Sequence, residues 1–168
     1  MDDGVQEGAM VDRIDTRPHG AVKHWPIVVL RVYAGLFFAW NGFGKISRDN
    51  FADGMEGFLN TQLANSFTFY RPFIESVVLP NKTMFAAMVA WGELAVGLAM
   101  IVGLATRYAA AVGAFLVLNF WFAKGAPVFA GTNHDVVWFV IFVVLGMVPA
   151  GKIAGLDDGL SDVLPFLR

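Results

Sequence analysis

The sequence predicts an all-α integral membrane protein: a four-helix transmembrane bundle with a long, partly helical peripheral linker between its first and second spans. Of its 168 residues, 57% are hydrophobic and 15% are charged, whereas soluble domains are about one quarter charged. The mean hydropathy of +0.58 is too high for a soluble core inside a polar surface. The bilayer is therefore the expected solvent, and an even number of crossings predicts both termini on the same side.

Four apolar segments are the expected spans, at residues 26–44, 84–104, 108–123 and 136–150. A helix needs about 20 apolar residues to cross a bilayer. The fourth segment is short, although His134 and Asp135 extend it by a partial turn to residues 134–150. Only a polar turn at residues 105–107 separates the second span from the third, which predicts an antiparallel helical hairpin.

A long linker, residues 47–83, joins the first span to the second. Apolar residues recur in it at helical spacing: Phe51, Met55, Phe58 and Leu59. This pattern predicts a helix that lies on the membrane surface. Residues 67–79 form a second such candidate, expected to stop at Pro80. Together they would form a lid over one mouth of the bundle, and the sequence leaves open whether the lid has a function or only covers helix ends.

The two ends of the chain are interpreted as tails of a membrane domain at residues 25–160. Residues 1–24 are polar and lack the apolar region of a signal peptide, and residues 161–168 form a short C-terminal tail. The terminal side carries one more Lys or Arg than the opposite side and includes the short turn at Arg107. Positively charged short loops favour the cytoplasm. We therefore expect a multi-pass cell-membrane protein with cytoplasmic termini.

The composition also restricts the chemistry. The absence of cysteine excludes a thiol relay and thiolate-held iron–sulfur clusters. The three histidines are His19, His24 and His134. Only His134 lies at a span, where it forms a polar group with Asp135 and Lys124, so no haem or metal site is expected. The net charge of −2, without a long basic run, indicates no nucleic-acid partner. Lipids, lipid-soluble molecules and other membrane subunits are the expected partners.

Two charged residues, Arg31 and Glu93, lie inside the expected spans. A charge at the bilayer centre costs about 2.5 kcal/mol or more, so both side chains are expected to face the bundle interior. At about 1.5 Å per residue, Asn41 and Asn119 reach nearly the depth of Glu93. The sequence thus predicts a layer of three polar side chains inside the bundle.

Arg31 and Lys45 flank this layer on one stripe of the first span. The same stripe carries Gly35 and Gly42, which allow a neighbouring helix to approach closely. Against this stripe, Glu93 would either ionise beside a cation and fix the helix packing, or take up a proton and act as a proton-handling or ligand-binding group. Both interpretations remain open at this stage.

Several motifs follow one another along the spans: LRVYAGLFFAWNGFGKI at 30–46, WGELAVGLAMIVGLATR at 91–107, LNFWFAKG at 118–125 and GKIAGLDDGL at 151–160. In this order they resemble the DoxX/DoxD-type membrane proteins over about residues 26–160. The resemblance implies a four-helix membrane fold and, for the DoxD branch, the membrane subunit of a thiosulfate dehydrogenase that reduces quinone. By motif position it points to Arg31, Asn41, Lys45, Glu93, Gly97 and Arg107.

The leading functional hypothesis is therefore a membrane subunit of a quinone-linked oxidoreductase. Glu93 is the expected catalytic residue, contacting the quinone head group or relaying its protons. The expected quinone-binding residues are Arg31, Asn41, Lys45, Asn119 and His134. Because the sequence carries no haem, flavin or metal motif, an additional redox subunit is expected as a partner. The alternative is a non-catalytic membrane anchor or assembly subunit of a redox complex, and a transporter is the weakest hypothesis because no inverted repeat is visible.

Overall fold

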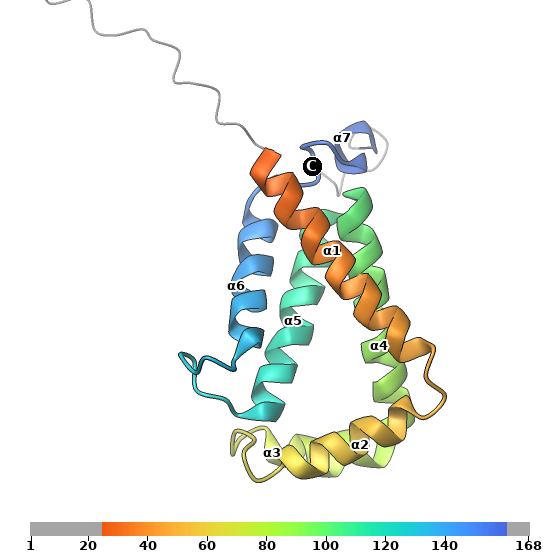
Figure 1. Ribbon diagram of the computed structural model, residues 1–168, viewed down its shortest axis with the longest axis vertical. Coiled ribbons are helices and arrows are strands. Elements are labelled where there is room, and N and C mark those ends of the chain that lie inside the picture. Colours follow the sequence, from red (N-terminus) through yellow and green to blue (C-terminus); the bar gives the residue numbers. More distant parts are fainter. Residues whose placement is uncertain (1–24, 161–168) are drawn as a thin grey trace, which may run out of the picture.

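The computed structural model describes residues 25–160, and within this range it is all helical, with no β-strand. The predicted tails at 1–24 and 161–168 lie outside the described residues. The main helices are α1 (Trp25–Ile46), α4 (Lys82–Val102), α5 (Thr106–Lys124) and α6 (His134–Met147), which pack side by side (Figure 1). The all-α class is confirmed, and each of these helices lies within a few residues of an expected span.

Three helical segments are long and apolar enough to cross a membrane: Trp25–Ile46, Arg71–Val102 and Thr106–Lys124. The fourth predicted span corresponds to α6, which has only 14 residues. It is apolar along its length but shorter than the others. The start of α1 and the short helix α7 (Leu156–Leu160) lie at the same end of the structure (Figure 1).

Close contact between α1 and α4 depends on glycines at their interface. A Cβ atom at Gly42 would clash with the backbone of Leu94 and come within 2.8 Å of the carbonyl oxygen of Ala90. A Cβ at Gly97 would clash with the backbone of Ala39. With no side chain at either position, the two backbones touch directly, as the small-residue stripe predicted.

The apolar core lies between the four main helices. Its fully or nearly buried residues are Ala34, Phe38, Val96, Met100, Ala109, Ala110, Val117, Phe142, Leu145 and Ala150. The Phe38 ring of α1 meets the Phe142 ring of α6 edge to face at a centroid distance of 4.8 Å. The core therefore joins α1 to α6.

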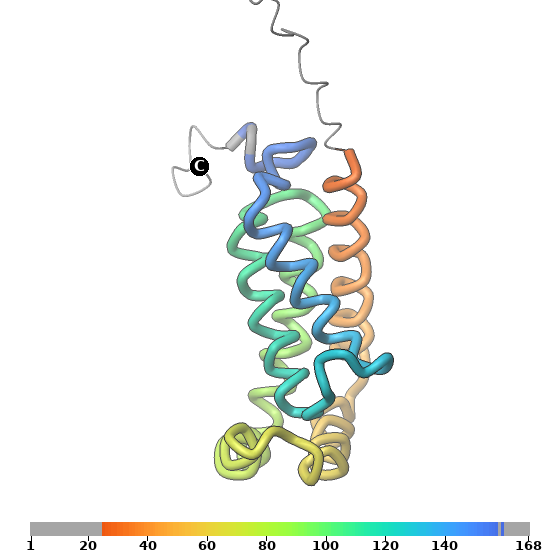
Figure 2. Tube along the Cα trace, turned by 90° about the vertical axis from the view of Figure 1, so that its left-hand side faces the viewer, coloured from red at the N-terminus to blue at the C-terminus, as the bar shows by residue number. Residues whose placement is uncertain are grey.

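The predicted linker is largely helical, and it lies across one end of the main helices (Figures 1 and 2). It contains α2 (Phe51–Gln62), α3 (Arg71–Phe73), a π-helical turn (Ile74–Val78) and a 3-10 turn (Leu79–Asn81). Leu59, Ile74 and Val78 are buried in a second apolar cluster with Ala123 at the end of α5. On the outer side, Lys82 binds Asp53 at 2.7 Å and Glu56 at 2.5 Å, which fixes α2 to the start of α4.

The prediction that the second peripheral helix stops at Pro80 is wrong. Helical turns continue from Arg71 through the proline into α4. The physical reason is local, because Pro80 occupies an early position of its 3-10 turn, where a proline needs no N–H donor and its fixed φ suits the turn. The π-helical and 3-10 turns change the direction of the chain there without ending the helix.

The first prediction concerns the glycine contact between α1 and α4. Gly42→Ala should lower the free energy of unfolding by about 1–3 kcal/mol, because the added methyl group meets backbone atoms that cannot move aside. Gly44→Ala on the same helix is the matched control, since its Cβ would have no neighbour within 4 Å. Thermal unfolding of both variants in detergent measures the difference. Equal stability of the two variants would show that the close contact is not required.

Candidate functional site

The centre of the candidate site is an ion pair between α1 and α4. The Nζ atom of Lys45 donates a hydrogen bond to Oε2 of Glu93. The side chain of Glu93 is 4% exposed and that of Lys45 is 24% exposed. The carboxylate is thus enclosed by the helices, while the ammonium group lies at the edge of the interface.

Two aromatic rings complete the surroundings of Lys45. Its Nζ atom lies 5.9 Å from the ring centroid of Phe51 at the start of α2 and 5.8 Å from that of Phe120 on α5. Both distances are within the range of cation–π attraction, which is strongest where water is excluded. Lys45 therefore joins four elements: its own helix, α4 through Glu93, α2 and α5.

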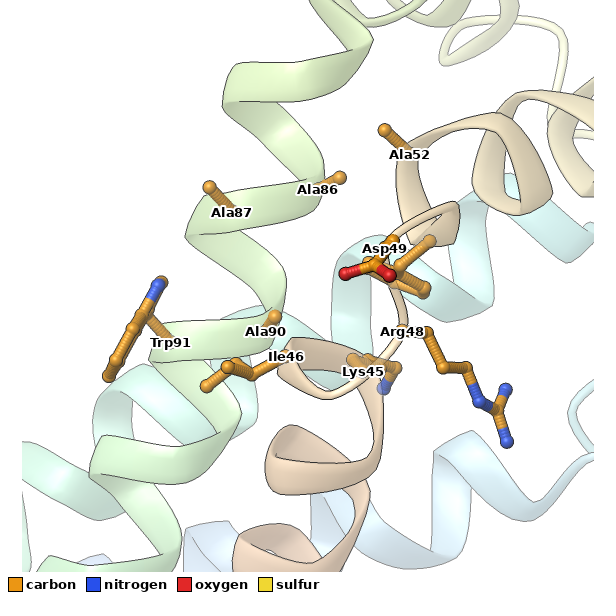
Figure 3. A pocket seen from close by; sticks show the side chains of 10 residues that line it. Lys45, Ile46, Arg48, Asp49, Ala52, Ala86, Ala87, Ala90 and Trp91 are labelled. Carbon is orange, nitrogen blue, oxygen red and sulfur yellow. The ribbon is translucent and has the colours of Figure 1, made fainter.

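A pocket opens beside this pair, and Lys45 is part of its wall (Figure 3). We call it the Lys45 pocket; its volume is about 170 Å³ and its lining residues are Lys45, Ile46, Arg48, Asp49, Phe51, Ala52, Ala86, Ala87, Ala90 and Trp91. Figure 3 shows Trp91 and Ile46 on one side of the pocket and Arg48 on the other. The pocket thus has an apolar edge along the membrane-spanning helices and a polar edge at their end.

The two asparagines of the predicted polar layer have hydrogen-bond partners other than Glu93. Nδ2 of Asn41 donates to the carbonyl oxygen of Phe37 in the same helix, at 2.8 Å. Nδ2 of Asn119 donates to the carbonyl oxygen of Phe115 at 2.6 Å, and its Oδ1 accepts from the Tyr70 hydroxyl at 2.5 Å. These contacts give Asn119 a role in fixing the peripheral segment to α5. A role of either asparagine in binding a ligand stays a prediction.

Arg31 lies on α1 about 21 Å from Lys45, at about 1.5 Å per residue. Its guanidinium donates to the carbonyl oxygens of Ala150 at 2.7 Å and Ala154 at 2.9 Å. The side chain is buried. The sequence left open which cation of the first span pairs with Glu93. In the structure it is Lys45 and not Arg31. Arg31 instead holds the segment after α6 against the start of α1.

The sequence reasoning missed Asp157, which completes this terminal end. Its carboxylate accepts hydrogen bonds from the backbone N–H groups of Ala105 at 2.6 Å and Thr106 at 3.1 Å. A carboxylate at a helix N-terminus satisfies donors that have no partner within the helix. The sequence did contain a signal for this contact. Asp157 is an acidic residue in the closing motif, and the predicted topology places that motif on the same side of the membrane as the short turn at 105–107.

His134, predicted to bind the quinone, is exposed at the start of α6. Its neighbour Asp135 is buried and forms an ion pair with Lys124 at 2.8 Å. The structure thus confirms contact within part of this polar group, between Asp135 and Lys124. Among residues 25–160, no three His, Cys, Asp or Glu side chains cluster so as to hold a metal ion.

Comparison with known proteins identifies a family. The family model described as DoxX matches residues 27–125, which is more than half of the chain. No curated protein and no solved structure matches the chain. The matched residues include both partners of the Lys45–Glu93 pair.

The second prediction tests whether the ion pair is coupled. Lys45→Met should lower the free energy of unfolding by about 3–5 kcal/mol, because it leaves a buried carboxylate without a partner. Glu93→Gln should cost less, since the ammonium group of Lys45 lies at the edge and can reach water. The double variant should recover much of the loss of Lys45→Met, as a double-mutant cycle in detergent would measure. Additive losses would show that the two side chains are not coupled.

The third prediction concerns Tyr70, which lies outside the spans. Burial raises the pKa of Tyr70 to about 12 from its ordinary value of 10.0. The folded protein favours the neutral phenol, so this contribution to stability is present below pH 10 and is lost as the pH rises toward 12. The ultraviolet phenolate absorbance of the native protein minus that of Tyr70→Phe should therefore show a step near pH 12. A step near pH 10 would mean that the hydroxyl is not buried against Asn119.

Proposed function

The chain belongs to the DoxX family, and we propose that it is the membrane subunit of a quinone-linked oxidoreductase that binds the quinone ring in the Lys45 pocket. The supporting observation is the Lys45–Glu93 pair, which adjoins this pocket inside a membrane protein. A carboxyl at such a depth is a functional candidate by default. Reduction of a quinone to a quinol consumes two electrons and two protons, so the binding site needs a group that delivers protons.

The residues of the pocket fit a single aromatic-sized ring. A cavity of about 150 Å³ accommodates benzene, and the Lys45 pocket has a volume of about 170 Å³. The Nζ atom of Lys45 is a hydrogen-bond donor suited to a ring oxygen. Ile46 and the exposed ring of Trp91 form an apolar edge along which an isoprenoid tail would pass into the lipid. We therefore propose entry of the ring from the bilayer past Ile46 and Trp91, beyond the point where α1 and α4 touch.

The two charged side chains have different roles in this proposal. Bound quinone supplies two-electron redox chemistry. Lys45 orients one ring oxygen, stabilises negative charge on it and donates a proton to it, while the Glu93 carboxylate accepts the shared hydrogen bond and relays a replacement proton to the amine. Arg31 and Asn119 contribute less directly in this proposal, because their observed contacts tie the chain ends and the peripheral segment to the helices. Asn41 and His134 do not line the Lys45 pocket, and their part in quinone binding stays a prediction.

Thiosulfate is the proposed electron donor, following the resemblance to the DoxD branch. Two thiosulfate anions that join through a new S–S bond release two electrons, which equals the demand of one quinone. A partner subunit that carries a redox group would oxidise the anions outside the membrane and pass the electrons to the pocket. The chain described here would supply the quinone site and the lipid-embedded part of such a complex.

We further propose that α6 is the fourth span, so that α1, α4, α5 and α6 form a transmembrane four-helix bundle with cytoplasmic termini. The buried contacts of α6 with Phe38 and the core support a place among the spans. The tight turn with Arg107 supports the orientation, because short loops carry the charge bias.

A non-catalytic anchor or assembly subunit is the second candidate function. It is favoured by the exposed aromatic rings of the peripheral segment, Phe58, Phe69 and Phe73, which are 43%, 65% and 37% exposed. Exposed apolar groups at the end of a membrane domain suit the docking of another subunit. In that case the Lys45–Glu93 pair would only hold α1 against α4.

The fourth prediction separates these functions. Glu93→Gln keeps the shape of the side chain but cannot exchange a proton near neutral pH, so thiosulfate-dependent quinone reduction by membranes should fall by about 10²-fold or more. Glu75→Gln is the matched control, because Glu75 is exposed on the peripheral segment. Detergent-solubilised stability is measured in parallel.

Unchanged turnover in a Glu93→Gln variant of normal stability would reject the catalytic role. Loss of the folded protein together with loss of turnover would instead assign the pair a purely structural role. A stoichiometric partner that co-purifies without quinone would favour the anchor function.

A further inference from the structure

The loop between α5 and α6 carries a large apolar side chain that is almost fully exposed. Phe129 is 98% exposed, and its neighbour Val128 is 44% exposed. In water, this position would leave a whole aromatic ring hydrated. Burial of such a ring is among the largest gains available to one side chain.

The loop lies within the length of the main helices and not beyond their end. Figures 1 and 2 show it projecting outward beside the start of α6, closer to the middle of the structure than α2 and α3. If α2 and the peripheral turns lie on the membrane surface, as the sequence predicts, a segment nearer the middle lies at or below that surface.

The length of α6 indicates the same depth. Its 14 residues extend about 21 Å, whereas the hydrocarbon core is about 30 Å thick. If α6 ends at the far surface beside the segment after Met147, its first residue does not reach the near surface. The residues before His134 must then lie at the boundary between head groups and acyl chains.

Several backbone carbonyl groups of the loop have hydrogen-bond partners within the protein. The carbonyl oxygen of Ala126 accepts from Nε1 of Trp121 at 2.7 Å, and that of Pro127 accepts from the buried Asn133 side chain at 3.0 Å. The carbonyl oxygen of Ala130 accepts from the N–H of Asn133 at 2.9 Å. Pro127 itself has no N–H group to satisfy. These internal partners reduce the cost of moving the loop out of water.

We propose that residues 125–133 form an interfacial loop whose Phe129 ring inserts among the lipid acyl chains. Its occupant is the bilayer itself, and the loop anchors the short helix α6 at a fixed depth. An aromatic ring at this level is the usual interfacial anchor, and Lys124, paired with Asp135, places a polar group at the end of α5, where the loop begins. The proposal rests on membrane placement alone and does not depend on the quinone site.

Site-directed spin labelling in liposomes tests this inference, because the chain has no cysteine that would compete for the label. The three variants are Phe129→Cys, Asn60→Cys on α2 as the control in water, and Trp40→Cys on α1 as the control in lipid. Asn60 is exposed, and Trp40 is 78% exposed along an expected span. None of the three side chains is part of the described core.

The free energy gained when a large apolar group is buried is greater than the free energy that corresponds to a tenfold change in an equilibrium. Collisions of the label at residue 129 with a water-soluble nickel complex should therefore be about tenfold fewer than at residue 60. Collisions with molecular oxygen should equal those at residue 40. Frequent nickel collisions would place the loop in water and overturn the proposal. Few collisions with either probe would show that protein covers the ring, in a second copy or another subunit, and would overturn it as well.

Discussion

An ionised carboxylate inside a bilayer must have a partner, and this constraint accounts for the interface between α1 and α4. Glu93 is buried on α4, and its cation, Lys45, comes from another helix. The two can meet only if the helices approach more closely than ordinary side chains allow. Gly42, one turn before Lys45, and Gly97, one turn after Glu93, remove the side chains that would hold them apart. The glycine stripe and the ion pair are thus parts of one arrangement, in which packing enables the pairing and the pairing stabilises the packing.

The sequence predicted this arrangement well because its signals are periodic and local. Apolar runs located the main helices, and a stripe of small residues with a cation at each end located the face of α1 that meets Glu93. It could not choose between the two cations. The partners of Arg31 are Ala150 and Ala154, which lie 119 and 123 positions later in the chain. No pattern within one helix predicts such a distant contact. The same holds for Asn119, whose partner Tyr70 lies in the peripheral segment.

The error at Pro80 has a different origin. A proline usually ends a helix because it lacks a donor and clashes with the preceding turn. Here a π-helical turn and a 3-10 turn take up the misfit, so the segment changes direction and continues as α4. Because of this continuity, the turns that lead into α4 begin next to Tyr70, whose hydroxyl donates to Asn119 of α5. The lid is therefore connected to the spans by helical turns as well as by side-chain contacts.

The two cations of α1 lie in very different surroundings. At the terminal end, Arg31 is buried, its Nη1 and Nη2 groups donate to backbone carbonyls, and the adjacent space beside Thr106 and Asp157 is only about 10 Å³. At the other end, Lys45 has one carboxylate and two ring faces as neighbours and borders a pocket of about 170 Å³. An ammonium group has three N–H donors, and one hydrogen bond to Glu93 leaves donors for another acceptor. The proposed quinone site therefore lies at the end where the cation borders open space, next to Glu93.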